Sequence, residues 1–361
     1  MKKFKQLLSL LLAMLMMVSL LTACGNTSTD DSDTDEIVVS DGDSDSESED
    51  TEEDETVETV TLNVAYMPNY GSLWSVLATM DLGYFEEEGL EINLIEFADG
   101  PTIIAAMEGG SIDIGYIGQG AHKLCVQGNA TIICMSHVDN GDAVIGGANV
   151  TSLEDLAGKT VAYSSGTSSE TILLSALESV GLTMDDITAM DMDSTAMVTA
   201  MLSGSVDACA VWSPASLTIL EEDENATLLC DNSTFSDTTV ALASWIATPS
   251  YLEENRDICV RFIRALLKGM TYAADEANYE YVSELVATQC ATDYDTAYQQ
   301  RGDGEWYTAD MIAEAIEDGS MEAFYQLQQD NFLAAGSIEE SDVCDVSTYV
   351  DFDLMLEALG E

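Results

Sequence analysis

Residues 110–117 read Gly-Ser-Ile-Asp-Ile-Gly-Tyr-Ile, and residues 204–211 read Gly-Ser-Val-Asp-Ala-Cys-Ala-Val. Each string closes a longer unit, in which a glycine-containing loop opens a helix, a Gly-Leu turn and a strand follow, and a short helix leads into the Gly-Ser-x-Asp step. The unit that starts at Gly71 reaches its aspartate after 42 residues, and the unit that starts at Gly166 reaches its own after 41. Matched order and length predict two similar lobes, with chance alignment of common α/β elements as the alternative.

Strand and helix patterns alternate along most of the chain, which predicts α/β lobes with mixed, mainly parallel sheets. Apolar runs predict strands at 60–66, 91–97, 112–117, 131–136, 160–163, 189–192 and 206–212. One helix is clear because Leu173, Leu177 and Val180 share one face, and a glycine follows as a stop. A second helix covers 103–107 and ends at the glycine pair that follows it.

The composition is extremely acidic. The 361 residues include 67 Asp and Glu against 10 Lys and Arg, which gives a formal charge of −57. Nucleic acid is excluded as a partner, because phosphate binding needs clustered Lys and Arg, and adhesion to anionic lipid through a basic face is disfavoured for the same reason. A chain of this length also favours two lobes over a single core.

The first 58 residues are not typical of a folded domain. Residues 1–23 combine three lysines, an apolar run of 15 residues and small residues before Cys24, which indicates an export signal. The Leu-Thr-Ala-Cys-Gly string resembles a bacterial lipobox, so Cys24 is expected to carry a lipid; an ordinary cleaved signal with an incidental cysteine is the alternative. Residues 24–58 hold 16 acidic groups, which predicts a disordered, self-repelling tether.

Cysteine and histidine usage argues against a disulfide framework or a metal site. Seven cysteines remain after Cys24, widely scattered and without C-x-x-C spacing, so most are interpreted as small buried hydrophobes. A single disulfide such as Cys125–Cys134 stays open. Because His122 and His137 are the only histidines, a histidine-rich metal receptor is not expected. We expect no metal and no cofactor.

Five strings resemble one protein family. They are 81–92 (Asp-Leu-Gly-Tyr-Phe-Glu-Glu-Glu-Gly-Leu-Glu-Ile), 105–117 with its Gly-Ser-Ile-Asp-Ile core, 153–162 (Leu-Glu-Asp-Leu-Ala-Gly-Lys-Thr-Val-Ala), 206–214 (Val-Asp-Ala-Cys-Ala-Val-Trp-Ser-Pro) and 251–255 (Tyr-Leu-Glu-Glu-Asn). Together they cover most of 60–275. They are similar to the solute-binding proteins of ABC importers, in the nitrate/sulfonate/taurine group with its thiamine-pyrimidine-precursor relatives.

The resemblance implies a fold. It is the type II periplasmic-binding-protein fold, a Venus flytrap of two α/β lobes joined by crossover strands. Lobe I would comprise 60–145 plus 247–361, and lobe II would comprise 146–246. The segment 252–340 would be mainly helices packed on lobe I.

The candidate ligand-binding residues lie where predicted strands end, because α/β folds bind ligands at the carboxyl ends of their strands. They are Asn69, Tyr70, Gly118, Gln119, His137, Ser165, Gly166, Thr167, Ser168 and Trp212. The hydroxyl-rich loop at 164–169 is interpreted as a cradle for a tetrahedral or planar anion at a helix start. A plain N-cap with its neighbours is the alternative.

Three aromatic or imidazole side chains keep two interpretations each. Trp212 either flanks the ligand or packs, and we favour flanking. His122 is expected on the helix beyond its loop, in a structural role, with ligand contact as the alternative. Trp74 is either adjacent to the cleft or part of the core.

The expected ligand is a small organic anion such as a sulfonate, taurine or nitrate. No Arg or Lys lies in the candidate loops, so helix N-termini and neutral donors would hold the anion, which suits a monoanion. If the ligand is instead a pyrimidine or thiamine-precursor ring, Tyr70 and Trp212 are candidates to stack on it.

The function implied is that of an extracytoplasmic, lipid-anchored receptor, which delivers its solute to an ABC permease and ATPase complex. No nucleophile–base or metal constellation is recognisable, so an enzyme is not expected, although pyrimidine-synthase relatives share the fold. A surface sensor without a transport role is the other alternative.

Overall fold

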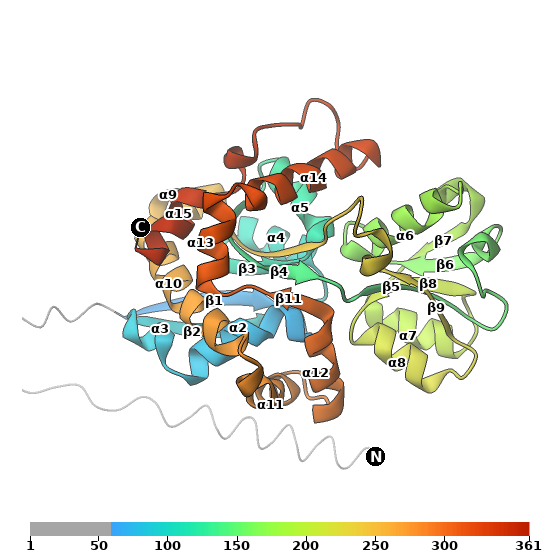
Figure 1. Cartoon of the computed structure of the whole chain (residues 1–361), viewed down its shortest axis with the longest axis horizontal. Helices are drawn as coiled ribbons and strands as arrows, with labels where there is room; N and C mark the ends of the chain where they lie inside the picture. Colours follow the sequence, from blue (N-terminus) through green and yellow to red (C-terminus); the bar gives the residue numbers. More distant parts are fainter. Residues whose placement is uncertain (1–58, 361) are drawn as a thin grey trace, which may run out of the picture. The chain divides into compact units, whose positions relative to one another are not determined.

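The computed structural model describes residues 59–360, which are drawn in colour in Figure 1. The predicted export signal at 1–23, the lipidation site Cys24 and the predicted tether at 24–58 lie outside the described residues. Within 59–360, no helix is long and apolar enough to cross a membrane.

The first lobe is built on a six-stranded sheet of order β11-β4-β10-β3-β1-β2. Its strands are β1 (Val60–Tyr66), β2 (Leu90–Glu96), β3 (Ile114–Ile117), β4 (Thr131–Asp139), β10 (Leu242–Ala247) and β11 (Gly304–Trp306). β1 is parallel to β2 and β3, and β10 runs antiparallel between β3 and β4. The carboxyl ends of β1, β3 and β4 therefore lie at one edge, where β11 pairs with β4.

The second lobe is built on a five-stranded sheet of order β7-β6-β8-β5-β9. Its strands are β5 (Asp142–Gly146), β6 (Thr160–Tyr163), β7 (Thr188–Asp191), β8 (Ala208–Trp212) and β9 (Thr227–Asp231). Helix α6 (Ser168–Ser179) covers one face, and α7 (Ser194–Leu202) and α8 (Ala215–Glu222) cover the other (Figure 1). Because β6 and β8 are parallel, their carboxyl ends also meet at one edge.

The remaining helices belong with the first sheet, and those of the C-terminal third pack on its core. They are α2 (Tyr70–Asp81), α3 (Tyr84–Glu87), α4 (Gly100–Glu108), α5 (His122–Val126), α9 (Pro249–Glu254), α10 (Arg256–Ala273), α11 (Tyr279–Gln289), α12 (Tyr294–Gln300), α13 (Ala309–Glu317), α14 (Ser320–Ala334) and α15 (Phe352–Leu359). The long helix α10 packs along α2, so the C-terminal part of the chain holds the helix that follows β1.

The two predicted repeat units have the same local structure. In each, the aspartate of the Gly-Ser-x-Asp step accepts a hydrogen bond from the backbone of the first parallel strand: Asn63 N donates to Asp113 Oδ2 (2.7 Å), and Thr160 N donates to Asp207 Oδ2 (2.9 Å). Each aspartate also donates its own N–H to the carbonyl of that same strand residue. The repeated sequence therefore marks a repeated clamp between strands, and the prediction of two similar lobes is confirmed.

Two boundaries differ from the predicted ones. β5 pairs with β8 and β9, so 142–145 belong to the second sheet although the sequence places them in lobe I. β10 pairs with β3 and β4, so 242–246 belong to the first sheet although the sequence places them in lobe II. The chain therefore crosses between the lobes directly after β4 and again between β9 and β10.

The described cysteines are free thiols. Cys125 and Cys134 are both buried and unpaired, so the disulfide left open between them is not formed in this structure. Burial raises the pKa of the Cys134 thiol to about 12, which keeps it protonated and unreactive at neutral pH.

The two aspartate clamps give the first prediction. Replacing Asp113 or Asp207 by Ala leaves a partly buried strand N–H without its acceptor, which is expected to lower the free energy of unfolding by about 1–3 kcal/mol. Asp113→Asn keeps an acceptor oxygen and should cost clearly less. Chemical denaturation measures both, and equal losses for Asp113→Ala and Asp113→Asn would show that the hydrogen bond is not the stabilising element.

Candidate functional site

A cavity of about 590 Å³, its open part included, lies between the two lobes. It is lined by strand ends of both sheets and by the segment that crosses from β4 to β5. The lining residues are Met67, Asn69, Gly71, Gly100, Pro101, Tyr116, Gly118, Ala121, His137, Asp139, Gly141, Thr167, Ser168, Trp212, Ser213, Gln300, Asp303 and Trp306.

Six of the ten predicted ligand-binding residues line this cavity, namely Asn69, Gly118, His137, Thr167, Ser168 and Trp212. Tyr70 does not, because its ring packs on Trp306 (centroids 5.3 Å apart) and its side chain is buried. Gln119 faces a separate pocket between α6 and α14. Ser165 and Gly166 are also absent from the lining. Contact of the six with a ligand stays a prediction.

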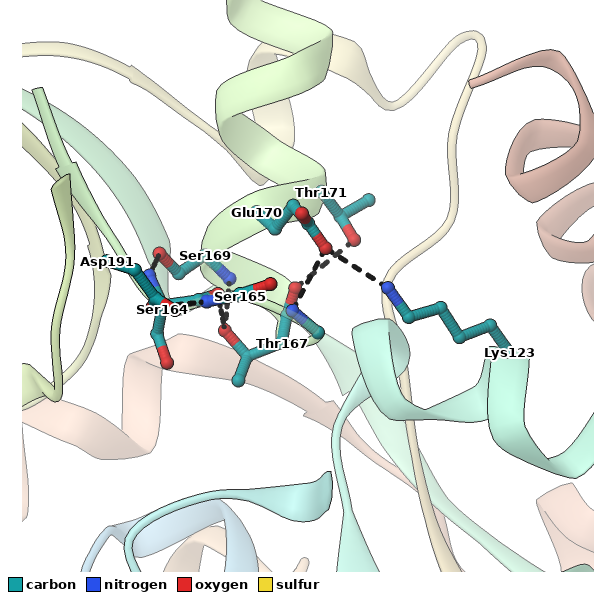
Figure 2. A network of polar contacts seen from close by, with 9 residues as sticks. Lys123, Ser164, Ser165, Thr167, Ser169, Glu170, Thr171 and Asp191 are labelled. Carbon is teal, nitrogen blue, oxygen red and sulfur yellow. Dashed lines mark hydrogen bonds and ion pairs between the residues drawn. The ribbon is translucent and has the colours of Figure 1, made fainter. Parts of the chain in front are cut away.

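The hydroxyl-rich loop at 164–169 uses several of its donors within the protein, as Figure 2 shows. The backbone N–H groups of Ser165 and Gly166 donate to the carboxylates of Asp191 (3.0 Å) and Glu170 (2.9 Å). Two of the loop hydroxyls donate to backbone carbonyls. Carboxylates and carbonyls thus take up donors that an anion would need, and the anion cradle stays a prediction.

Three carboxyl groups gather where the chain crosses from β4 to β5. Asp139 ends β4, Asp142 begins β5, and Asp303 directly precedes β11, which pairs with β4. Asp142 accepts hydrogen bonds from Ser168 Oγ (2.6 Å) and Asn232 Nδ2 (3.0 Å). No ion pair between described residues involves any of the three.

Burial and mutual repulsion favour the protonated form of these carboxyls. Burial, followed by the neighbouring Asp142, raises the pKa of Asp139 well above its ordinary value, and burial raises the pKa of Asp142. Burial also raises the pKa of Asp303 to about 7, although Ser213 beside it acts in the opposite direction. The cluster therefore holds protons near neutral pH, as a coupled set of groups.

Aromatic rings form one wall of the cavity. The ring of Trp306 lies 4.6 Å from that of His137 and 5.0 Å from that of Trp74, and Tyr116 stacks on His137 at 6.2 Å. Burial lowers the pKa of His137 to about 3, so its imidazole is neutral at pH 7. Trp74 lies behind this wall in the core, where its Nε1 donates to Ser136 Oγ (3.2 Å).

His122 takes part in the packing of the first lobe. It begins α5, is buried, and its Nδ1 lies 2.7 Å from Gln328 Oε1. Burial lowers its pKa to about 4. Its position beyond the Gly118 loop agrees with the structural role expected from the sequence.

The two lobes touch beside the cavity. Lys123 Nζ of α5 lies 3.1 Å from Glu170 Oε2 of α6 (Figure 2). Next to this ion pair, Gly120 in the 3₁₀ turn Gln119–Ala121 approaches the backbone of Thr167 so closely that any Cβ would overlap the Thr167 carbonyl. A glycine is therefore required at this contact between the lobes.

Comparison with known families identifies the family of this chain. The sequence pattern of the family described as "NMT1/THI5 like" matches residues 73–278, more than half of the 361 residues. The chain belongs to the NMT1/THI5-like family. The resemblance inferred from the five strings is thereby confirmed.

Relatives of this NMT1/THI5-like protein carry the names of binding proteins. A Brucella abortus (strain 2308) protein named "Putative binding protein" is 27% identical over 282 residues, which are 78% of this chain and 88% of that one. The taurine-binding periplasmic protein of Escherichia coli (strain K12) is 22% identical over 214 residues, 58% of this chain and 65% of that one.

Solved structures share the fold. The alkanesulfonate-binding protein SsuA from Xanthomonas axonopodis pv. citri, bound to MOPS, has a TM-score of 0.64 at 20% identity and covers 81% of this chain and 99% of its own. The predicted two-lobe periplasmic-binding-protein fold is confirmed. The desulfurization enzyme DSZB has the same fold, with a TM-score of 0.60 at 14% identity. The fold alone therefore does not separate binding from catalysis.

Sequence reasoning missed the acidic cluster and Trp306. A readable signal existed for Asp139 and Asp142, which bracket an Asn-Gly turn directly after a predicted strand. No local signal existed for Asp303 and Trp306, because they reach β4 only through the pairing of β11, from more than 160 residues further along the chain.

The acidic cluster predicts how stability depends on pH. Because the pKa of Asp303 is raised to about 7 from 3.8, the folded chain holds a proton between about pH 4 and pH 7 that the unfolded chain has lost. The free energy of unfolding should therefore fall as pH rises through this window. Asp303→Asn should flatten the fall and stabilise the protein by about 1–3 kcal/mol at pH 8.

The control must remove the same formal charge elsewhere, because the whole chain is acidic. Asp237→Asn serves, since Asp237 is exposed in the loop between β9 and β10. Denaturation at pH 5 and pH 8 compares the variants. If Asp303→Asn and Asp237→Asn change the pH dependence equally, general repulsion and not the cluster is the cause.

Proposed function

We propose that the protein is the extracytoplasmic solute-binding component of an ABC importer. It binds a small polar solute in the cavity between its lobes and presents the closed, loaded form to a membrane permease and its ATPase. The observation that carries this proposal is the cavity itself, which takes its lining from the strand ends of both lobes and from a crossover segment. A site divided in this way couples occupancy to lobe closure.

The relatives support a binding role over an enzymatic one. Their names describe proteins that bind taurine and alkanesulfonates. In the cavity, burial lowers the pKa of the His137 imidazole to about 3, whereas burial raises the pKa of the Asp139 and Asp303 carboxyls. A neutral imidazole whose Nδ1 faces Ser136 Oγ (3.0 Å) is poorly suited to take up a proton.

The solute follows less directly from the relatives. A sulfonate, taurine or nitrate is the anion expected from the sequence, and rings such as Trp306 and Tyr116 would also suit a small planar solute. The lining contains Asp139 and Asp303 but neither Lys nor Arg. A simple monoanion would therefore bind against carboxyl groups, so the test must span ligands of both charges.

The test follows lobe closure. The full chain is titrated with taurine, alkanesulfonates, nitrate, pyrimidines and simple primary amines while thermal unfolding and small-angle X-ray scattering are recorded. One class is expected to raise the Tm and make the protein more compact. If no class does either, the proposed function is wrong.

Gly120→Ala probes the same closure. Because a Cβ at this position overlaps the Thr167 carbonyl, the variant should hold the lobes apart and weaken solute binding at least about tenfold. Gly109→Ala is the matched control, since Gly109 ends α4 with ordinary helical angles and its added Cβ would make ordinary contacts. Equal affinities for the two variants would show that this approach is not part of closure.

The location is part of the proposal. Lipidation at Cys24, followed by the acidic segment 24–58, would hold the two lobes at the outer face of the cell membrane. Cys24→Ala should move the protein from the membrane fraction to the soluble fraction, while Cys290→Ala should not. Retention of Cys24→Ala in the membrane fraction would exclude a lipid anchor at this residue.

A further inference from the structure

The cavity between the lobes is acidic at its own surface. Asp139 and Asp303 line it, Asp142 lies buried beside them, and no Lys or Arg contributes to the lining. The ion pairs of the described chain lie elsewhere, on α5 with α6, on α10 with α3 and around α15. The acidic groups of the cavity therefore have no cationic partner in residues 59–360.

The three carboxyls differ in the hydrogen bonds that they accept. Asp142 accepts from Ser168 Oγ and Asn232 Nδ2. Asp139 Oδ1 accepts from Gly141 N (2.9 Å), and the Asp303 carboxyl has the Ser213 hydroxyl beside it. Asp142 is thus a structural group, while Asp139 and Asp303 keep free acceptor oxygens at the cavity.

Ser213 is an independent sign of a missing partner. It lines the cavity at the end of β8 and is 6% exposed, and its Oγ lies beside the Asp303 carboxyl without a hydrogen bond of ordinary geometry to any described residue. A buried hydroxyl without a partner is costly and uncommon in native proteins. Its place beside Asp303 puts a neutral acceptor next to a carboxyl, a combination that suits a ligand with several N–H donors.

Aromatic faces complete the site. Trp306 and Tyr116 flank the neutral ring of His137 on the first lobe, and Trp212 lines the cavity from the second. Such faces attract ammonium and guanidinium groups through the negative potential of their π-systems. They also offer an apolar surface to the hydrocarbon part of a small solute.

We propose that the solute is an organic cation, a small molecule with a primary ammonium or amidinium group. Its N–H groups donate to Asp139 and Asp303 and to Ser213 Oγ, and its carbon skeleton lies against Trp306 and Tyr116. This inference rests on the proposed function, because it names the class of solute for the same cavity.

Two competing occupants fit the same surface less well. A metal ion would need a converging set of ligands, and residues 59–360 contain no group of three or more His, Cys, Asp or Glu that could hold one. A simple anion would meet two carboxyl groups, and two of the N–H donors of the loop at 164–169 are bonded to Asp191 and Glu170. An ammonium group, in contrast, would neutralise the carboxylate charge. In its absence, burial favours protonation of these carboxyls.

The test compares ligands that differ only in charge. The full chain is titrated calorimetrically with two matched sets: benzylamine, benzyl alcohol and phenylmethanesulfonate, then butylamine, butanol and butanesulfonate. At pH 8, we expect an amine to bind at least tenfold more tightly than the alcohol and the sulfonate of its set. Asp303→Asn and Asp139→Asn should each weaken amine binding about 10–100-fold without loss of thermal stability. Asp237→Asn should leave it unchanged.

Each outcome decides something. Tighter binding of a sulfonate or an alcohol overturns the cation inference and leaves the solute-binding function standing. Amine binding that Asp303→Asn and Asp237→Asn weaken equally reflects the overall negative charge of the chain, and it also overturns the inference. If no compound of either set binds and the broader panel also fails, both proposals fall.

Discussion

This structure depends on three carboxyl groups that lie where the chain passes from one lobe to the other. Residues 59–360 give them no cationic partner. Asp139 and Asp142 stand at the two ends of the first crossing, so the charge cluster and the junction between the lobes are the same few residues. Asn232 binds both sides of the junction, donating to the carbonyl of Asp139 and to the carboxyl of Asp142. Any change in the charge of the cluster therefore acts directly on the segment that joins the lobes.

The cluster lowers the stability of the folded state, and its presence therefore indicates a functional role. Desolvated carboxyls repel one another, and a chain selected for stability alone would place a neutral or apolar group at these positions. Groups of this kind are retained at functional sites, where a ligand supplies the missing partner. The extreme acidity of the whole chain has a different origin, since it belongs mainly to exposed side chains and to the segment before residue 59. Net charge would not have located the site.

Local sequence patterns predicted the parts of the fold that local patterns control. The parallel strands and the two Gly-Ser-x-Asp steps could be read from the sequence, because each repeat unit folds on its own β-α-β connection. The strands β5, β9, β10 and β11 were not predicted. Three of them lie at or beside the crossings, and β11 is three residues long, so their pairing depends on segments far away in the chain.

The same division holds for the candidate site. The strand-end rule found Gly118, His137 and Trp212, which line the cavity. It could not find Asp303, because only the β11–β4 pairing brings that residue to the junction. The rule also selected the hydroxyl-rich loop at 164–169, whose contact with an anion stays a prediction. Asp191, which accepts from the Ser165 N–H, reaches this loop only through the parallel pairing of β6 and β7. Composition of a loop thus shows which groups are available, but not which are already bonded.

The most direct test of a cation site is to count the protons exchanged when the cavity fills. An amine shown to bind is titrated calorimetrically at pH 7 in buffers of different ionisation enthalpy. Because the pKa of Asp303 is raised to about 7, a bound cation should lower this pKa and release up to about half a proton, with Asp303→Asn releasing clearly less. Uptake of protons on binding, or no exchange at all, would contradict the account.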